Sequence, residues 1–322
     1  MIATLGIILL QFESKGVYNS TMKTIVTHHY PDADAITSVW LIKTFFIGWE
    51  EADIVFVPAG QTLGGAQPDS DDEIVHVDTG MGKFDHHQSD SPTCAARLVF
   101  EHLREERGAG GVSAPTDFID HQNAHHWHEE ALDRLTKIVV DIDHFGQVYW
   151  PDPASDIYDF SFDGMLGGLK LITLGRNGDR EVAEFGMKAL DGIYHTLINK
   201  VWAESELKTK GVEFTFKRKK GIGIESINDD TMPIAQKIGY ALTIRKDPNK
   251  GYVRIKAHPG SGIDLAPLYE ALKKKDSEAT WFLHASHKML LNGSTKNPTM
   301  KSSTLSLSDI IEIVKECKLV KS

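Results

Sequence analysis

Histidine and aspartate side chains gather in three short segments of the first half of the chain. These are His28-His29-Tyr30-Pro31-Asp32-Ala33-Asp34, then Asp78 with Asp85-His86-His87-Gln88, and finally Asp141-Ile142-Asp143-His144. Carboxylate oxygens and imidazole nitrogens suit Mn²⁺, Mg²⁺ or Zn²⁺, and several carboxylates without cysteine favour Mn²⁺ or Mg²⁺. A capped helix start is the alternative interpretation of Asp32 and Asp34, because aspartate is common at that position.

Strand-like segments precede each acidic segment and would position it. β-branched and apolar runs predict strands over Thr24–Thr27, Asp53–Pro58, Glu73–Val77 and Thr136–Val140. Apolar residues at helical spacing predict helices over Ala35–Phe46, Pro92–Arg107 and Ala124–Leu135. Strands that alternate with helices indicate an α/β fold with a parallel sheet covered on both faces. Ligand sites in such sheets form beyond the carboxyl ends of the strands, where we expect the three segments to meet.

The second half of the chain has a different pattern. A long helical stretch over Asp179–Lys210 precedes predicted strands at Val212–Phe216, Gly221–Glu225, Ala241–Arg245 and Tyr252–Ala257 and a helix at Leu265–Lys274. We therefore expect a metal-binding catalytic domain over 22–178, a helical linker over 179–211 and a smaller α/β substrate-binding domain over 212–322. Residues 1–21 precede Met22 and are interpreted as an extension from an upstream start, with an extra strand as the alternative.

Charge separates the two halves. The 322 residues carry a formal net charge of −10, but residues 1–199 hold 13 Lys and Arg against 31 Asp and Glu, while residues 200–322 hold 22 against 14. The acidic total excludes a protein that coats nucleic acid by charge alone. Two cysteines exclude a disulfide scaffold. The sequence shows no secretory leader and no run long enough to span a bilayer, so we expect a cytoplasmic protein without membrane partners.

Taken together, the motifs resemble those of the DHH phosphoesterase superfamily, in that family's order. The matching residues are His28-x-x-Pro-Asp32-x-Asp34, Asp78, Asp85-His86-His87 and Asp141. The family includes RecJ-like exonucleases, oligoribonucleases, cyclic-dinucleotide phosphodiesterases, exopolyphosphatases and manganese inorganic pyrophosphatases. The resemblance implies two divalent cations, with Mn²⁺ favoured over Mg²⁺. His28, Asp32 and Asp78 would hold one, and Asp34, Asp78, His86 and Asp141 the other. His87 would face the phosphate and Asp85 would orient a histidine.

The resemblance continues into the second half. The segments 252–268 and 281–294 resemble the family's C-terminal substrate domain, although glycines of its Gly-Gly-Gly-His signature are replaced. It implies that these residues contact substrate: Arg254, His258, His284, Ser286, His287, Lys288, Asn292 and Gly293.

The expected activity is hydrolysis of phosphodiester or phosphomonoester bonds in short oligonucleotides or nucleotides by a metal-activated water, without a covalent protein nucleophile. An inorganic pyrophosphatase or exopolyphosphatase, and a catalytically weak nucleotide-binding sensor, are the alternatives. A homodimer stays open at this point. The short spacing from Asp78 to Asp85 and the altered C-terminal signature speak against the pyrophosphatase.

Overall fold

The computed structural model describes residues 22–107, 124–173, 178–293, 297 and 299–319. The interpreted extension over residues 1–21 lies outside this described part. The chain divides into two compact units, residues 1–106 with 138–187 and residues 107–137 with 188–322. Both units combine helices and strands, which confirms the predicted α/β class.

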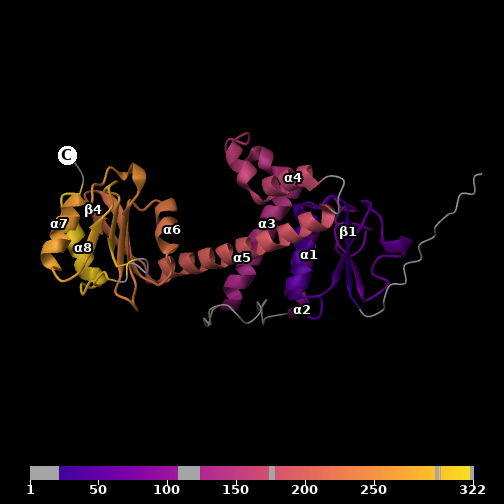
Figure 1. Cartoon of the computed structure of the whole chain (residues 1–322), viewed down its shortest axis with the longest axis horizontal. Helices are drawn as coiled ribbons and strands as arrows, with labels where there is room; N and C mark the ends of the chain where they lie inside the picture. The colour runs from indigo at the N-terminus through magenta and orange to yellow at the C-terminus, as the bar shows by residue number, and fades with distance from the viewer. Residues whose placement is uncertain (1–21, 108–123, 174–177, 294–296, 298, 320–322) are drawn as a thin grey trace, which may run out of the picture. The chain divides into compact units, whose positions relative to one another are not determined.

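The elements are shown in Figure 1. The helices are α1 (Ala33–Phe45), α2 (Ala95–Arg107), α3 (Ala124–Asp143), α4 (Phe162–Thr173), α5 (Gly178–Lys210), α6 (Thr231–Lys237), α7 (Ala266–Lys275) and α8 (Leu307–Glu316). The strands are β1 (Thr24–His28), β2 (Asp53–Val57), β3 (Ile74–His76), β4 (Val212–Phe216), β5 (Lys219–Glu225), β6 (Leu242–Lys246), β7 (Val253–Ala257), β8 (Trp281–Leu283) and β9 (Met289–Asn292). Short 3-10 helices are η1 (Leu63–Gly65), η3 (Gly146–Tyr149), η4 (Asp156–Phe160) and η5 (Pro259–Ser261).

The first unit is built on a parallel sheet in the order β2-β1-β3. β1 is the central strand, and its Ile25 and Val26 are fully buried. α1 follows β1 and is buried on nearly all sides. Gly186 of α5 permits a close approach here, because a Cβ at this position would lie 2.7 Å from Ile36 of α1. The carboxyl end of β1 and the start of α1 are therefore held in a tightly packed frame.

One predicted strand is wrong. Thr136–Val140 lies inside α3, where Leu132, Leu135 and Val139 are buried at spacings of three and four residues and Ile138 is 49% exposed. This is helical periodicity, which outweighs the local β preference of the Ile-Val-Val run because it buries one continuous face. The other three strands of the first half are confirmed.

The second unit contains a mixed six-stranded sheet in the order β4-β5-β6-β7-β9-β8. β5 and β6 are parallel and the remaining pairs are antiparallel. Figure 1 shows α7 and α8 on one face of this sheet, where the main core of the unit forms around Ile244, Ile255 and Leu290. A capping box between Ser306 and Asp309 fixes the start of α8.

Among the described residues, none of the helices is both long enough and apolar enough to cross a membrane.

Candidate metal centre

The loop from β1 to α1 presents His28 and Asp32. Asp32 is the N-cap of α1, and its Oδ1 accepts from the backbone N–H groups of Asp34 and Ala35 at 3.0 and 3.1 Å. Its Oδ2 lies 3.9 Å from His28 Nε2. One oxygen of Asp32 therefore caps the helix, as the alternative interpretation expected, while the other faces the histidine, and its role as a metal ligand stays a prediction.

Asp34 joins α1 to the start of α2. Its carboxylate is 1% exposed and accepts from the backbone N–H groups of Ala95 and Ala96, both at 2.7 Å. A helix N-terminus offers free N–H groups and partial positive charge, which favour a carboxylate there. Burial and the nearby Asp78 nevertheless raise the pKa of Asp34 well above its usual range.

Asp78 lies two residues beyond β3 and is 3% exposed. Its backbone has a φ of 54°, and its N–H donates to the Phe84 carbonyl at 3.0 Å. Oδ2 lies 3.1 Å from His28 Nε2 and Oδ1 lies 3.4 Å from His86 Nε2. Burial alone would raise the pKa of Asp78, but the two histidines hold it below its usual value.

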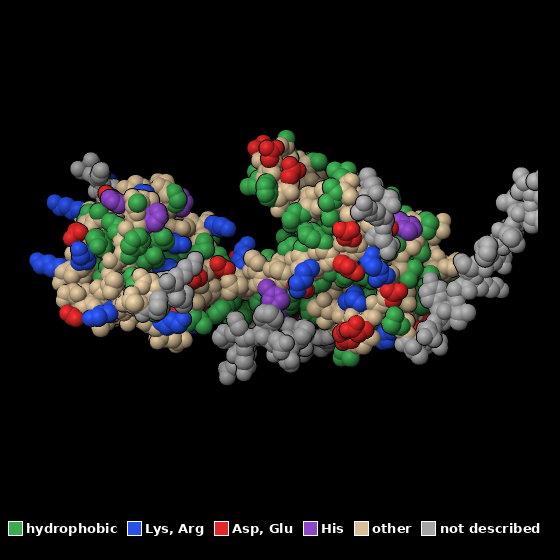
Figure 2. Space-filling view, in the orientation of Figure 1, with side chains coloured by type: hydrophobic (Ala, Val, Ile, Leu, Met, Phe, Trp, Pro, Cys, Tyr) green, Lys and Arg blue, Asp and Glu red, His purple; other side chains and the backbone are tan. Residues whose placement is uncertain are grey.

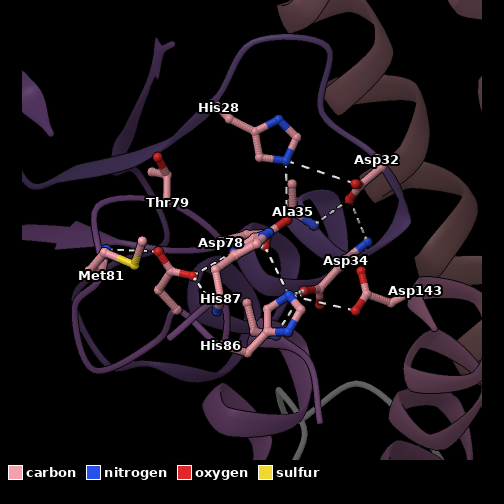
Figure 3. Close-up of polar contacts among 12 residues, drawn as sticks. His28, Asp32, Asp34, Ala35, Asp78, Thr79, Met81, His86, His87 and Asp143 are labelled. Atoms are coloured by element: carbon pink, nitrogen blue, oxygen red, sulfur yellow. Dashed lines mark hydrogen bonds and ion pairs between the residues drawn. The ribbon is translucent and has the colours of Figure 1, made fainter. Parts of the chain in front are cut away.

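His86 lies among three carboxylates (Figure 3). Its Nε2 is 3.4 Å from Asp78 Oδ1, 3.6 Å from Asp143 Oδ2 and 3.7 Å from Asp34 Oδ2. The contact with Asp78 raises the pKa of His86 to about 9. Burial opposes this rise, and the charges of Asp143 and Asp34 add to it. His28 behaves alike: burial alone would lower its pKa, but the hydrogen bond to Asp78 and the charge of Asp32 raise it to about 9.

Asp85 orients His87. The Asp85 carboxylate is buried, accepts from the backbone N–H of Met81 at 2.7 Å and lies 2.7 Å from His87 Nδ1. A carboxylate on Nδ1 fixes the proton there and leaves Nε2 as the nitrogen available to a ligand. The His87 side chain is 56% exposed.

The sequence-predicted ligand Asp141 does not reach this cluster. Its Oδ2 accepts from Trp150 Nε1 at 2.6 Å, and its carboxylate occupies the space where a Cβ of Gly146 would lie. Residues two positions apart on a helix point about 200° apart, so Asp143 reaches His86 where Asp141 does not. Asp143, from the same acidic segment, therefore stands beside His86 where the sequence analysis expected Asp141.

Two buried atoms in the cluster lack partners. Among the described residues, neither Asp78 Oδ1 nor His86 Nε2 has a hydrogen-bond partner. Atoms that share an ion at about 2.1 Å lie roughly 3 Å apart, close to the separations seen here. His28, Asp32 and Asp78 form one group within metal-ligand reach, and Asp78, His86 and His87 form another. The residues therefore fit divalent cations, with Asp34 and Asp143 beside His86.

Asp179, in the first turn of α5, was not predicted from the sequence as part of the site. Its Oδ2 lies 2.6 Å from His29 Nδ1, and its Oδ1 accepts from the backbone N–H of Tyr30 at 2.9 Å. Tyr30 has a φ of 55°, a left-handed conformation that carries strain in a bulky residue. Asp179 thus holds the loop that carries His28 and Asp32. No short motif marks this residue, because its partners lie about 150 positions away.

The histidines predicted to contact substrate lie in the second unit. Figure 2 shows histidine side chains gathered along one edge of its surface. His284 Nδ1 lies 2.8 Å from the Ser286 hydroxyl, His287 Nδ1 lies 3.1 Å from Asp264, and Lys288 donates to the Ile263 carbonyl. The backbone N–H of Ala257, next to His258, donates to the Lys288 carbonyl.

Two of the predicted substrate contacts, Asn292 and Gly293, have roles within the fold. Asn292 is fully buried; its amide donates to the Thr280 and Lys301 carbonyls, and its oxygen accepts from the Ser303 N–H. Gly293 has a φ of 79°, and a Cβ there would lie 2.0 Å from the Tyr252 ring. The Asn292 side chain is therefore committed to protein groups, and only glycine fits beside Tyr252 at position 293.

Comparisons with known proteins give distant likenesses. No family model and no curated protein sequence matches the chain. The solved structures that match the chain include RecJ from Thermus thermophilus in complex with Mg²⁺, at 12% identity and a TM-score of 0.25 over 91% of this chain and 49% of RecJ. The chain thus spans about half the length of RecJ. A Methanococcus jannaschii protein assigned to the family II inorganic pyrophosphatases is 15% identical, with a TM-score of 0.21 over 91% of this chain and 99% of that protein.

Proposed function

We propose that the chain is a two-metal phosphoesterase that hydrolyses short oligonucleotides or nucleotides. The observation that carries this proposal is the buried ion pair of Asp78 Oδ1 and His86 Nε2, which lie 3.4 Å apart and have no hydrogen-bond partner among the described residues. Buried polar atoms are normally hydrogen-bonded, and an exception calls for an ion or a functional role. His28, Asp32 and Asp78 would hold one cation, and Asp34, Asp78, His86 and Asp143 a second.

Two divalent cations, when bound, would lower the pKa of a shared water towards neutrality and offset charge on the phosphoryl oxygens. The protein's own groups would do the rest. His87, oriented through Nδ1 by Asp85, would donate a hydrogen bond from Nε2 to a phosphoryl oxygen when its ring is an imidazolium. Asp34 and Asp32, held by backbone N–H groups, would keep their positions while substrate enters.

A phosphoester panel tests the proposal. The dinucleotide pApA, bis-p-nitrophenyl phosphate, pyrophosphate and tripolyphosphate would be assayed with Mn²⁺ and with Mg²⁺, using Asp78→Ala as the matched control. We expect Mn²⁺-dependent hydrolysis of pApA that EDTA abolishes and the variant lacks. Bound Mn²⁺ with no turnover of any ester would favour a nucleotide-binding sensor. Faster hydrolysis of pyrophosphate than of pApA would favour the pyrophosphatase alternative.

The remaining functional expectations belong to the same proposal. Mn²⁺ is favoured over Mg²⁺ on the donor set, and the division into a catalytic domain (22–178), a linker (179–211) and a substrate-binding domain (212–322) would separate chemistry from binding. The basic surface of the second unit (Figure 2) is suited to an anionic substrate.

A further inference from the structure

The sheet of the second unit has two unlike faces. Val253, Ile255 and Ala257 of β7 are buried in the core on one face, whereas Arg254 and Lys256 between them are only half-buried on the other. Part of that other face is covered, because Ile222 and Ile224 of β5 pack with residues of α5 and α6. From β7 to β8 this face carries partly or fully exposed side chains.

The strand registers place four side chains of this face, from β6 to β8, in one line. Arg245 is paired with Arg254, Arg254 with Leu291, and Leu291 with Phe282. We call these four residues the Arg254–Phe282 row. Strands in a sheet lie about 4.8 Å apart, so Arg254 and Phe282, two strands apart, are separated by roughly 10 Å. Phe282 is 49% exposed and its neighbour Trp281 is buried, as expected when alternate residues face opposite sides of a sheet.

The cationic end of the row is held in place by one carboxylate. Arg245 is 5% exposed, donates to the Ser226 carbonyl at 2.7 Å and pairs with Asp229 Oδ1 at 2.5 Å. Arg254 pairs with Asp229 Oδ2 at 2.7 Å. Two guanidinium groups thus lie side by side against a single negative charge, and Lys256 adds a further positive charge on the same face.

We propose that the Arg254–Phe282 row binds one nucleotide of a single-stranded nucleic acid, with a phosphate at Arg254 and a base stacked on Phe282 and Leu291. Cations that meet the backbone beside aromatic side chains that stack on bases are the physical basis of single-strand binding. An inorganic polyphosphate would use the arginines but would leave the exposed aromatic ring without a role. This inference rests on the proposed function and narrows its substrate class to nucleic acid.

Binding measured without turnover tests it. The full-length protein in EDTA would be titrated with a short fluorescent single-stranded oligonucleotide and with the same oligonucleotide made abasic. For Phe282→Ala we expect about tenfold weaker binding of the base-containing strand, within the range for loss of one stacking contact, and unchanged binding of the abasic strand. For Arg254→Gln we expect weaker binding of both strands and a salt slope smaller by about 0.7.

Phe185→Ala is the matched control, because Phe185 is 42% exposed but lies on α5 outside the row. Thermal unfolding of each variant separates loss of binding from loss of fold, and Phe282→Leu provides a milder substitution. Equal weakening of both strands by Phe282→Ala, or none, would overturn the inference. Because EDTA prevents hydrolysis, this result stands apart from the phosphoester panel: a chain that binds as predicted but hydrolyses nothing contradicts only the proposed function.

Discussion

The metal cluster of the first unit gathers carboxylates, whereas the arginine pair of the second unit gathers positive charge. In the cluster, buried carboxylates face one another across His86, and two buried polar atoms have no hydrogen-bond partner among the described residues. In the second unit, Arg245 and Arg254 share Asp229, and His287 pairs with Asp264. The first arrangement calls for cations, whereas the second keeps a net positive charge, because one carboxylate only partly offsets two guanidinium groups. A ligand of the second unit must compete with Asp229 and Asp264, which suits weak and reversible binding.

The largest expected effect comes from removing Asp78, the carboxylate shared by both ligand groups. Asp78→Ala should lower Mn²⁺-dependent hydrolysis by about a thousandfold, because cations at such sites contribute several kcal/mol to the transition state. Steady-state kinetics under excess Mn²⁺ measures this. The fold should persist, because the substitution also removes a buried charge near Asp34. Wild-type activity in this variant would contradict the ligand assignment.

A smaller effect separates Asp143 from Asp141. Asp143→Asn should lower activity and Mn²⁺ affinity by about a hundredfold, as expected for a ligand of a single cation. Asp141→Asn should change either quantity by no more than about threefold, because its carboxylate bonds to the Trp150 indole. Calorimetric titration of both variants with Mn²⁺ provides the comparison. A greater loss with Asp141→Asn would restore the sequence-based ligand set.

The smallest effect concerns pH. His28 and His86 have pKa values of about 9, above the ordinary 6.5, so protonation stabilises the fold of protein stripped of metal. That contribution is fully present below pH 6.5 and is lost as the pH rises through 9. The Tm of stripped protein should therefore fall between pH 6.5 and pH 9. With Mn²⁺ bound, the two histidines are deprotonated ligands, so the fall should disappear and metal affinity should rise with pH. If calorimetry shows that the Tm of metal-stripped protein does not change with pH in this range, the two histidines do not interact with these carboxylates.

Much of the first unit was predictable because its signals are local. Thr24–Thr27 and Glu73–Val77 are short apolar runs with acidic residues just beyond them, and the structure places both in the parallel sheet. The strand assigned to Thr136–Val140 was wrong because four local β-branched residues were given more weight than the helical spacing of apolar residues along α3. That strand, together with the family resemblance, led to Asp141 as the expected ligand, because it directly follows Val140.

The sequence pattern could not predict contacts between residues that lie far apart in the chain. Asp179 meets His29 across about 150 residues, and nothing local marks it. Asn292 stands in a segment that resembles a substrate motif, yet burial and three hydrogen bonds give it a structural role. Phe282 was passed over because only strand register shows that it aligns with Arg254.

The two backbone hydrogen bonds that hold the Asp34 carboxylate affect which cations the site would accept. Both of its oxygens accept backbone N–H groups at 2.7 Å, so the carboxylate cannot swing to offer two oxygens to one ion. Ca²⁺ takes six to eight oxygen ligands at about 2.3–2.6 Å, often from bidentate carboxylates, whereas Mg²⁺ takes six at about 2.0–2.1 Å. Limiting the coordination number in this way would discriminate against Ca²⁺ through geometry rather than charge. Competition of Ca²⁺ against Mn²⁺ for the protein measures that selectivity directly. If Ca²⁺ displaces bound Mn²⁺ as readily as Mg²⁺ does, the Asp34 carboxylate is not held in a fixed orientation.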